Sequence, residues 1–235
     1  MTEPEMPQSA VILLSGGADS ATLLAHVSRE LGIPEVVALS LCYGQRHSRE
    51  LDMARLQATA AGAREHRVID ISFLGDITAS RTALAETGIP VPDLDELDED
   101  QRRQPPTYVP HRNLVFLSLA AATAESEGIQ DVYYGAQAQD EYGYWDCTAD
   151  FVERLNATLS LNRDRPVRIH APFVEKSKSD VIRIGLALGV DYANTWTCYR
   201  GGERPCGTCP SCVERAAAFE SAGSADPLVA EGSVS

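Results

Sequence analysis

Short apolar runs alternate with longer amphipathic segments along most of this chain. Five runs have the length and the apolar or β-branched content of buried strands, and they span residues 10–14, 35–41, 66–71, 131–135 and 167–171. Segments rich in helix-forming residues lie between and after them, over 20–31, 45–62, 113–127, 151–161, 176–188 and 213–219. Because alternating strands and helices are typical of βαβ units, the pattern predicts an α/β fold with a parallel sheet flanked by helices.

Residues 72–110 interrupt this alternation. Glycine and proline recur there, at Gly88, Pro90, Pro92, Pro105, Pro106 and Pro110, and six of the eight residues in 93–100 are acidic. We expect the acidic run to be a solvated loop and the whole segment to be a lid-like loop beside a binding site. We also expect residues 1–9 to form a disordered lead and 220–235 a flexible tail. Residues 10–190, including the segment 72–110, are then expected to form one α/β domain.

Composition narrows the class of protein. The chain has 235 residues, of which 44% are apolar and 23% are charged, as in ordinary globular proteins. Its net charge of −14 repels phosphodiester backbones and anionic lipid, which disfavours an extended nucleic-acid surface or a membrane partner. No apolar run reaches the roughly 18 residues of a spanning helix. No basic segment precedes the first apolar run, so we expect a cytoplasmic protein.

A glycine-rich loop joins the first predicted strand to the first predicted helix, with the sequence Ser15-Gly-Gly-Ala-Asp-Ser20. Gly16 and Gly17 allow a ligand to approach the backbone closely, and amides at a helix start favour an anion. Ser15 and Ser20 add hydroxyl donors, while Asp19 either caps the helix or holds a metal ion on phosphates. The loop lacks the Walker A lysine and the G-x-G-x-x-G pattern. We interpret it as a phosphate-binding loop in preference to a plain strand–turn–helix connection.

Four of the six cysteines lie close together near the C-terminus, at Cys198, Cys206, Cys209 and Cys212. Four thiolates at this spacing can complete a tetrahedral zinc shell, which would be structural because no coordination position stays open. An iron–sulfur cluster and a redox pair for sulfur transfer are the alternatives. We favour zinc and expect residues 191–219 to form a small zinc-binding subdomain.

The hexapeptide at 15–20 resembles the SGGxDS loop of the N-type ATP pyrophosphatase (PP-loop) superfamily, which includes GMP synthetase and NAD synthetase. This resemblance implies a Rossmann-like, adenine nucleotide alpha-hydrolase-like sheet that binds ATP at the carboxyl ends of its strands. Further motifs look like those of the QueC family, the 7-cyano-7-deazaguanine synthases of queuosine biosynthesis. They are YGQRH at 43–47, YVPHRN at 108–113, GYWDC at 143–147 and TWTCY at 195–199, followed by the cysteine cluster.

The resemblance to the QueC family implies an activity, cofactors and partners. The family enzyme converts 7-carboxy-7-deazaguanine and ammonia to the nitrile, through an adenylated carboxylate and then an amide. Direct attack on a carboxylate would expel oxide, which explains the requirement for ATP. The family also implies Mg²⁺ with ATP, a structural Zn²⁺ and a homodimer.

The family motifs also imply site residues in this sequence. Ser15, Gly16, Gly17, Asp19 and Ser20 would hold the ATP phosphates. Asp19, Ser20, Arg112 and Lys178 would be catalytic, with the two cations meeting phosphate or substrate carboxylate. Asn113, Asp140, Tyr144 and Asp146 would bind the deazaguanine. Zinc would be held by Cys198, Cys206, Cys209 and Cys212. For Arg112, Asn113, Tyr144 and Lys178 the alternatives are a surface arginine, a helix cap, a packed core residue and an exposed lysine.

The chain departs from the family pattern in the half expected to bind the deazaguanine. Trp145 stands where the family often has proline, Thr148 where it has arginine, and His111 where it has a small residue. An alternative is therefore a paralogue that activates the same acid and joins it to another amine, such as a protein amino terminus, in antiphage defence or nucleic-acid modification. A tRNA sulfur-transferase is disfavoured by the acidic charge. A zinc-stabilised nucleotide-binding module without catalysis is the last alternative.

Overall fold

The protein is described here from a computed structural model, which covers residues 7–44, 49–84, 89–138 and 144–230. Five strands form one parallel sheet in the order β3-β2-β1-β4-β5. Their bounds are Ser9–Leu13 for β1, Glu35–Cys42 for β2, Glu65–Asp70 for β3, Asp131–Tyr133 for β4 and Arg168–His170 for β5. Each strand overlaps the apolar run that predicted it, and the predicted α/β fold with a parallel sheet is confirmed.

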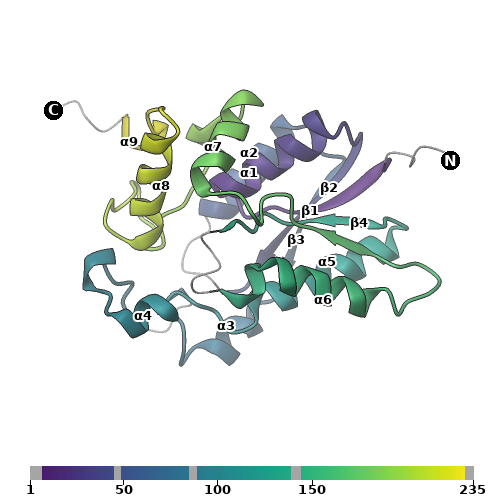
Figure 1. Cartoon of the computed structure of the whole chain (residues 1–235), viewed down its shortest axis with the longest axis horizontal. Helices are drawn as coiled ribbons and strands as arrows, with labels where there is room; N and C mark the ends of the chain where they lie inside the picture. Colours follow the sequence, from purple (N-terminus) through teal and green to yellow (C-terminus); the bar gives the residue numbers. More distant parts are fainter. Residues whose placement is uncertain (1–6, 45–48, 85–88, 139–143, 231–235) are drawn as a thin grey trace.

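Helices cover both faces of the sheet (Figure 1). The main helices are α1 (Ala18–Ala25), α2 (Arg49–Ala60), α5 (Arg112–Ser126), α6 (Ala149–Leu159), α7 (Lys178–Ala187) and α8 (Pro210–Ser221). A π-helical turn, η1 (His26–Glu30), continues α1. The side chains of β1 alternate between two cores: Val11 packs in the core beneath α5 and α6, and Ile12 in the core beneath α1, α2 and α7. Burial on both faces explains why the strands are continuous apolar runs.

The sheet order places β1 in the centre, where the chain changes direction. From β1 the chain moves outward through β2 to β3, and then returns to the other side of β1 to form β4 and β5. In an open parallel sheet, ligands bind beyond the carboxyl ends of the strands at such a switch point. The glycine-rich loop follows β1 directly, so the topology places it at this position.

Short helices occupy much of residues 72–110, where the sequence predicted a loop. They are α3 (Phe73–Thr78), η2 (Leu94–Glu96) and α4 (Glu99–Arg103). Acidic residues begin two of them: the carboxylate of Asp98 accepts the Gln101 amide at 2.8 Å, and the Gln101 side chain accepts the Asp98 amide at 3.1 Å. The difference from the expected loop arises because these carboxylates act as helix caps.

Residues 220–230 also differ from the flexible tail expected over 220–235. Helix α8 extends to Ser221, and a further turn, α9 (Pro227–Ala230), follows. Arg215, only 3% exposed, forms a bidentate ion pair with Asp226, with Nε–Oδ2 and Nη2–Oδ1 distances of 2.8 and 2.9 Å. The composition of the segment gave no sign of this pair, which anchors α9 to the domain.

A side chain from α6 covers the outer edge of β5. Asn156 donates from Nδ2 to the carbonyl of Ile169 at 2.9 Å and accepts from the amide of Ile169 at 2.8 Å. The terminal strand thus has its outward backbone groups satisfied by a side chain. No helix among the described residues is long and apolar enough to cross a membrane.

Candidate active site

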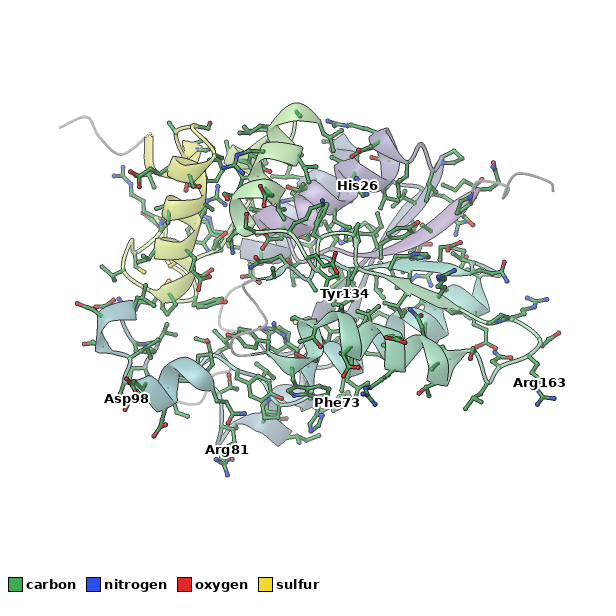
Figure 2. All side chains as sticks on the ribbon, viewed as in Figure 1. His26, Phe73, Arg81, Asp98, Tyr134 and Arg163 are labelled. Carbon is green, nitrogen blue, oxygen red and sulfur yellow. The ribbon has the colours of Figure 1, made fainter. Side chains whose placement is uncertain are left out.

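A cavity of about 280 Å³ opens at the carboxyl ends of the central strands. Its walls come from the glycine-rich loop, α2, α5, α7, the segment 196–199 and α8. Tyr134, which directly follows β4 and lines the cavity, lies near the centre of the molecule in Figure 2. The candidate residues Ser15, Gly17, Asp19, Ser20, Arg112, Asn113, Tyr144, Lys178 and Cys198 all line this one cavity. Residues from distant parts of the sequence are therefore brought together as a single site.

The phosphate loop is held in shape by its own polar groups and by α2. Gly16 has a φ of +89°, and a Cβ there would lie 2.0 Å from the carbonyl oxygen of Glu50, so only glycine fits. The Ser15 and Ser20 hydroxyls are 3.1 Å apart, and Ser20 Oγ also donates to the Gly17 carbonyl at 3.1 Å. The first amides of a helix have no partner within the helix. In α1 the N-cap residue is Gly17, and no side chain at this position accepts a hydrogen bond from them. This geometry suits an anion at the helix start.

The first residue of α7, Lys178, is a buried lysine that lies beside the glycine-rich loop. Lys178 is 8% exposed, and its Nζ lies 3.5 Å from Oδ2 of Asp19. The other Asp19 oxygen, Oδ1, is buried and has no hydrogen-bond partner within the described part of the chain. An unpartnered carboxylate oxygen is a hard ligand, which fits a divalent cation such as Mg²⁺ beside phosphates. The cap formed by Ser177, which accepts the Asp180 amide at 3.2 Å, fixes the start of α7 and so the position of Lys178.

Helix α5 presents Arg112 to the cavity. The residue before it, His111, adopts a left-handed conformation with a φ of 56° and starts the helix abruptly. The Arg112 guanidinium lies 6.0 Å from the ring centroid of Tyr43 and forms a hydrogen bond with that side chain. A fixed guanidinium in a half-enclosed cavity can bind a carboxylate or a phosphate.

Asp146 is not among the residues that line the cavity, and its carboxylate caps the start of α5. It is 1% exposed, and its carboxylate accepts the Asn113 amide at 3.0 Å and the Asn113 side chain at 3.4 Å. Asn113 also donates to Cys147 Sγ at 3.1 Å. Burial raises the pKa of Asp146, although the Asn113 amide and Arg112 act in the opposite direction. A role for Asp146 in binding the substrate stays a prediction. Asp140 lies outside the described residues.

Sequence reasoning missed Glu50, which lines the cavity from the first turn of α2. Desolvation raises its pKa to about 7 against the opposing effect of Arg112, and Cys198 adds to the increase. A carboxylate with this pKa can accept or release a proton near neutral pH. Glu214 of α8 also lines the cavity, and desolvation together with Asp19 raises its pKa. In the sequence both residues look like ordinary acidic positions on helix surfaces, so no local signal identifies them.

The four cysteines form one cluster, as the sequence predicted. Their sulfur atoms all lie within 4.8 Å of one another, and Cys198, Cys209 and Cys212 are buried. Backbone amides support the sulfurs: the Cys206 amide lies 3.4 Å from Cys198 Sγ, and the Cys209 amide 3.3 Å from Cys206 Sγ. Four thiolates with amide donors and no other ligand type fit a tetrahedral zinc ion. Because Cys198 also lines the cavity, the cysteine cluster adjoins the candidate active site.

Comparison with known proteins identifies the family. The family model described as "Queuosine biosynthesis protein QueC" matches residues 9–223. This chain belongs to the QueC family. It is 44% identical over 232 residues to a 7-cyano-7-deazaguanine synthase from Chromohalobacter salexigens, which covers 99% of this chain and 90% of that protein. The synthase of the same name from Archaeoglobus fulgidus is 44% identical over 223 residues, covering 94% of this chain and 90% of that one.

The fold of this QueC-family chain also resembles that of a solved structure. The NMN synthetase from Francisella tularensis superposes with a TM-score of 0.51 at 17% identity, covering 93% of this chain and 78% of that one. At this identity the likeness concerns the fold alone. It agrees with the predicted Rossmann-like sheet.

Two of this chain's departures from the usual QueC pattern meet at one point beside the cavity. The Tyr108 hydroxyl accepts the indole N–H of Trp145 at 2.9 Å and the backbone amide of His111 at 3.3 Å. The His111 and Trp145 rings pack edge to face at 5.5 Å. Tyr144, which lines the cavity, packs 6.0 Å from Tyr108 and shares a 3.0 Å hydrogen bond with the Thr107 hydroxyl. The departures therefore form one aromatic cluster behind Tyr144.

Proposed function

We propose that this protein is an ATP-dependent carbon–nitrogen ligase that converts 7-carboxy-7-deazaguanine and ammonia to 7-cyano-7-deazaguanine. The observation that carries the proposal is a phosphate loop and two cations around one cavity, in a chain whose relatives of similar length are named as that synthase. The expected Zn²⁺ would be held by the four cysteines, and ATP and Mg²⁺ by the cavity.

The proposed reaction begins with activation of the acid. A carboxylate oxygen attacks the α-phosphorus of ATP, a P–O bond to pyrophosphate breaks, and an acyl adenylate forms. Ammonia attacks the acyl carbon, the C–O bond to AMP breaks, and the nitrogen releases its extra proton to give an amide. The amide oxygen then attacks the α-phosphorus of a further ATP and pyrophosphate leaves. The C–O bond to AMP breaks and the nitrogen has lost its two protons, which gives the nitrile. AMP is a far better leaving group than oxide, so activation makes both displacements possible.

Positioning and charge neutralisation would supply much of the rate enhancement. In the proposal, the first amides of α1 and the hydroxyls of Ser15 and Ser20 hold the phosphates. Lys178 neutralises charge that develops on the phosphates. Bound Mg²⁺ would add further neutralisation, held by the unpartnered oxygen of Asp19.

The substrate half of the cavity suits a planar acid. Arg112 would hold the reacting carboxylate, and Tyr144 would stack on the deazaguanine ring. Asn113 lines the cavity but already donates to Asp146 and Cys147, so we propose that it supports Arg112 by fixing the start of α5. Glu50, near Arg112, is the described carboxylate best placed to exchange a proton with the incoming nitrogen.

A second candidate keeps the activation step but changes the amine. The cluster of His111, Tyr108 and Trp145 favours it, because Trp145 is 45% exposed beside a residue that lines the cavity. An exposed aromatic next to the active site could contact a macromolecular acceptor, such as a protein amino terminus. In that case the product would be an amide bond to the acceptor.

One experiment separates these proposals. The purified protein is incubated with 7-carboxy-7-deazaguanine, ATP, Mg²⁺ and ammonium, and the products are identified by mass spectrometry. We expect the nitrile, and none when ATP is omitted. An adenylate that accumulates despite ammonium would favour the other amine. Absence of any ATP-dependent product of the acid would contradict both candidates.

A further inference from the structure

The backbone carbonyl of Gly16 connects the phosphate loop to residues 194–198, the segment that ends at Cys198. One hydrogen bond is direct and the other runs through the side chain of Gln57. The carbonyl oxygen of Gly16 accepts the backbone amide of Trp196 at 2.9 Å and Nε2 of Gln57 at 3.0 Å. The same Nε2 donates to the carbonyl of Asn194 at 2.7 Å. A side-chain amide has two N–H donors, so Gln57 can serve both carbonyls at once. Gln57 is only 8% exposed, and water competes little for these bonds.

The segment that receives these bonds leads directly into the metal centre. Trp196 is two residues before Cys198, the first cysteine of the cluster. Its ring lies 4.3 Å from the guanidinium of Arg49, at the start of α2. Arg49 also donates to the carbonyls of Gly202 and Glu203 at 2.8 and 2.7 Å, within the loop between the first two cysteines. Helix α2 therefore contacts the phosphate loop through Gln57 and the cysteine loop through Arg49.

The loop that α2 holds has intrinsic freedom. Gly16 adopts a positive φ, which glycine reaches easily but also leaves easily. Bonds that fix its carbonyl select one conformation and reduce the ordering needed when phosphates bind. A metal ion on Cys198 would fix the end of segment 194–198, and that segment fixes the Gly16 carbonyl. Metal binding at the cysteines would thus favour phosphate binding at the loop. Because coupling between two sites is reciprocal, phosphate binding would favour metal binding by the same factor.

We propose that Gln57 is a positioning residue through which metal binding at the four cysteines and nucleotide binding at the phosphate loop strengthen each other. The inference rests on the proposed function only in taking ATP as the nucleotide. It assigns α2 a role that neither the phosphate loop nor the cysteine cluster has alone.

Zinc release provides the test. The zinc-loaded protein is mixed with a chromogenic chelator, with and without a saturating non-hydrolysable ATP analogue and excess Mg²⁺, and the rate of zinc loss is followed. Analogue binding is measured separately by calorimetry. We expect the analogue to slow zinc release about 5-fold or more in the wild type, the lower end of typical coupling. In Gln57→Met, which keeps the side-chain volume but has no donors, we expect less than a 2-fold effect.

Controls keep the result interpretable. Gln130→Met changes an exposed glutamine before β4 and should retain the wild-type effect. If Gln57→Met does not fold, Gln57→Asn is used, because its shorter amide cannot reach both carbonyls. An undiminished effect in a folded Gln57 variant would overturn the proposal, as would wild-type zinc release that is indifferent to bound analogue. If calorimetry detects no analogue binding to the wild type, the proposed function fails as well, which distinguishes the two failures.

Discussion

Replacing Asp226 by asparagine should destabilise the whole domain, although this residue lies only nine positions before residue 235. The substitution keeps the shape but removes the charge that pairs with Arg215, and the two side chains are 6% and 3% exposed. A buried ion pair that loses one partner leaves an uncompensated charge, at a cost of about 3–5 kcal/mol. Arg215 retains hydrogen bonds to Thr195, Thr197 and the carbonyl of Tyr192. We therefore expect the lower end of that range.

The assays are urea and thermal denaturation, each followed by circular dichroism, with the same metal content in every sample. A loss of about 3 kcal/mol corresponds to a fall in melting temperature of roughly 6–12 °C for a domain of this size. Asp150→Asn is the matched control, because its pair with Arg154 has side chains 68% and 78% exposed and should change stability by less than about 1 kcal/mol. Equal, small changes in the two variants would refute the claim that α9 is anchored by this pair.

Three further predictions concern the site. Asp19→Ala should reduce nitrile formation by at least about 100-fold while the melting temperature stays close to that of the wild type, and normal turnover would remove Asp19 from the proposed chemistry. Cys209→Ser should lose bound metal and thermal stability together, as judged by elemental analysis and calorimetry; an unchanged melting temperature would argue against a structural metal. The pKa of Glu50 is raised by desolvation from 4.5 to about 7, so the folded state holds this proton more tightly than the unfolded state. Stability from this group is complete below about pH 4.5 and is lost as the pH rises through about 7, by up to about 3 kcal/mol. Urea midpoints measured at pH 5 and pH 8 should show that the Glu50→Gln variant loses less stability between these two pH values than the wild type does. Equal losses in the two proteins would contradict the raised pKa of Glu50.

Features encoded in short segments could be predicted from the sequence. The β1 run and the following Ser-Gly-Gly define a strand and a tight turn locally, and β1 begins within one residue of the prediction. The four cysteines lie within fifteen residues, so their clustering hardly depends on the rest of the fold. In such cases the residues that interact are also close in the sequence.

Features that depend on long-range packing could not be predicted in this way. Asp146 follows β4, which suggested a substrate-binding carboxylate, but nothing in the sequence indicated that α5 starts against it and that the backbone amide of Asn113 donates to its carboxylate. Glu50 looked like a solvated helix residue, yet its backbone carbonyl lies against Gly16 and the residue lines the cavity. The small residues after 220 suggested flexibility, but a single aspartate reaches the buried Arg215. Each outcome depends on a partner remote in sequence.

The amide of Asn156 has a consequence for how copies of this chain could associate. An exposed terminal strand is a template on which another chain can extend the sheet. Here both outward-facing peptide groups of Ile169 are already occupied by Asn156, so a neighbouring strand would have to displace that side chain before it could add. The lateral growth that leads to fibrils is discouraged on this side. A dimer of the kind expected for this family would then not be expected to form by extending the sheet beyond β5.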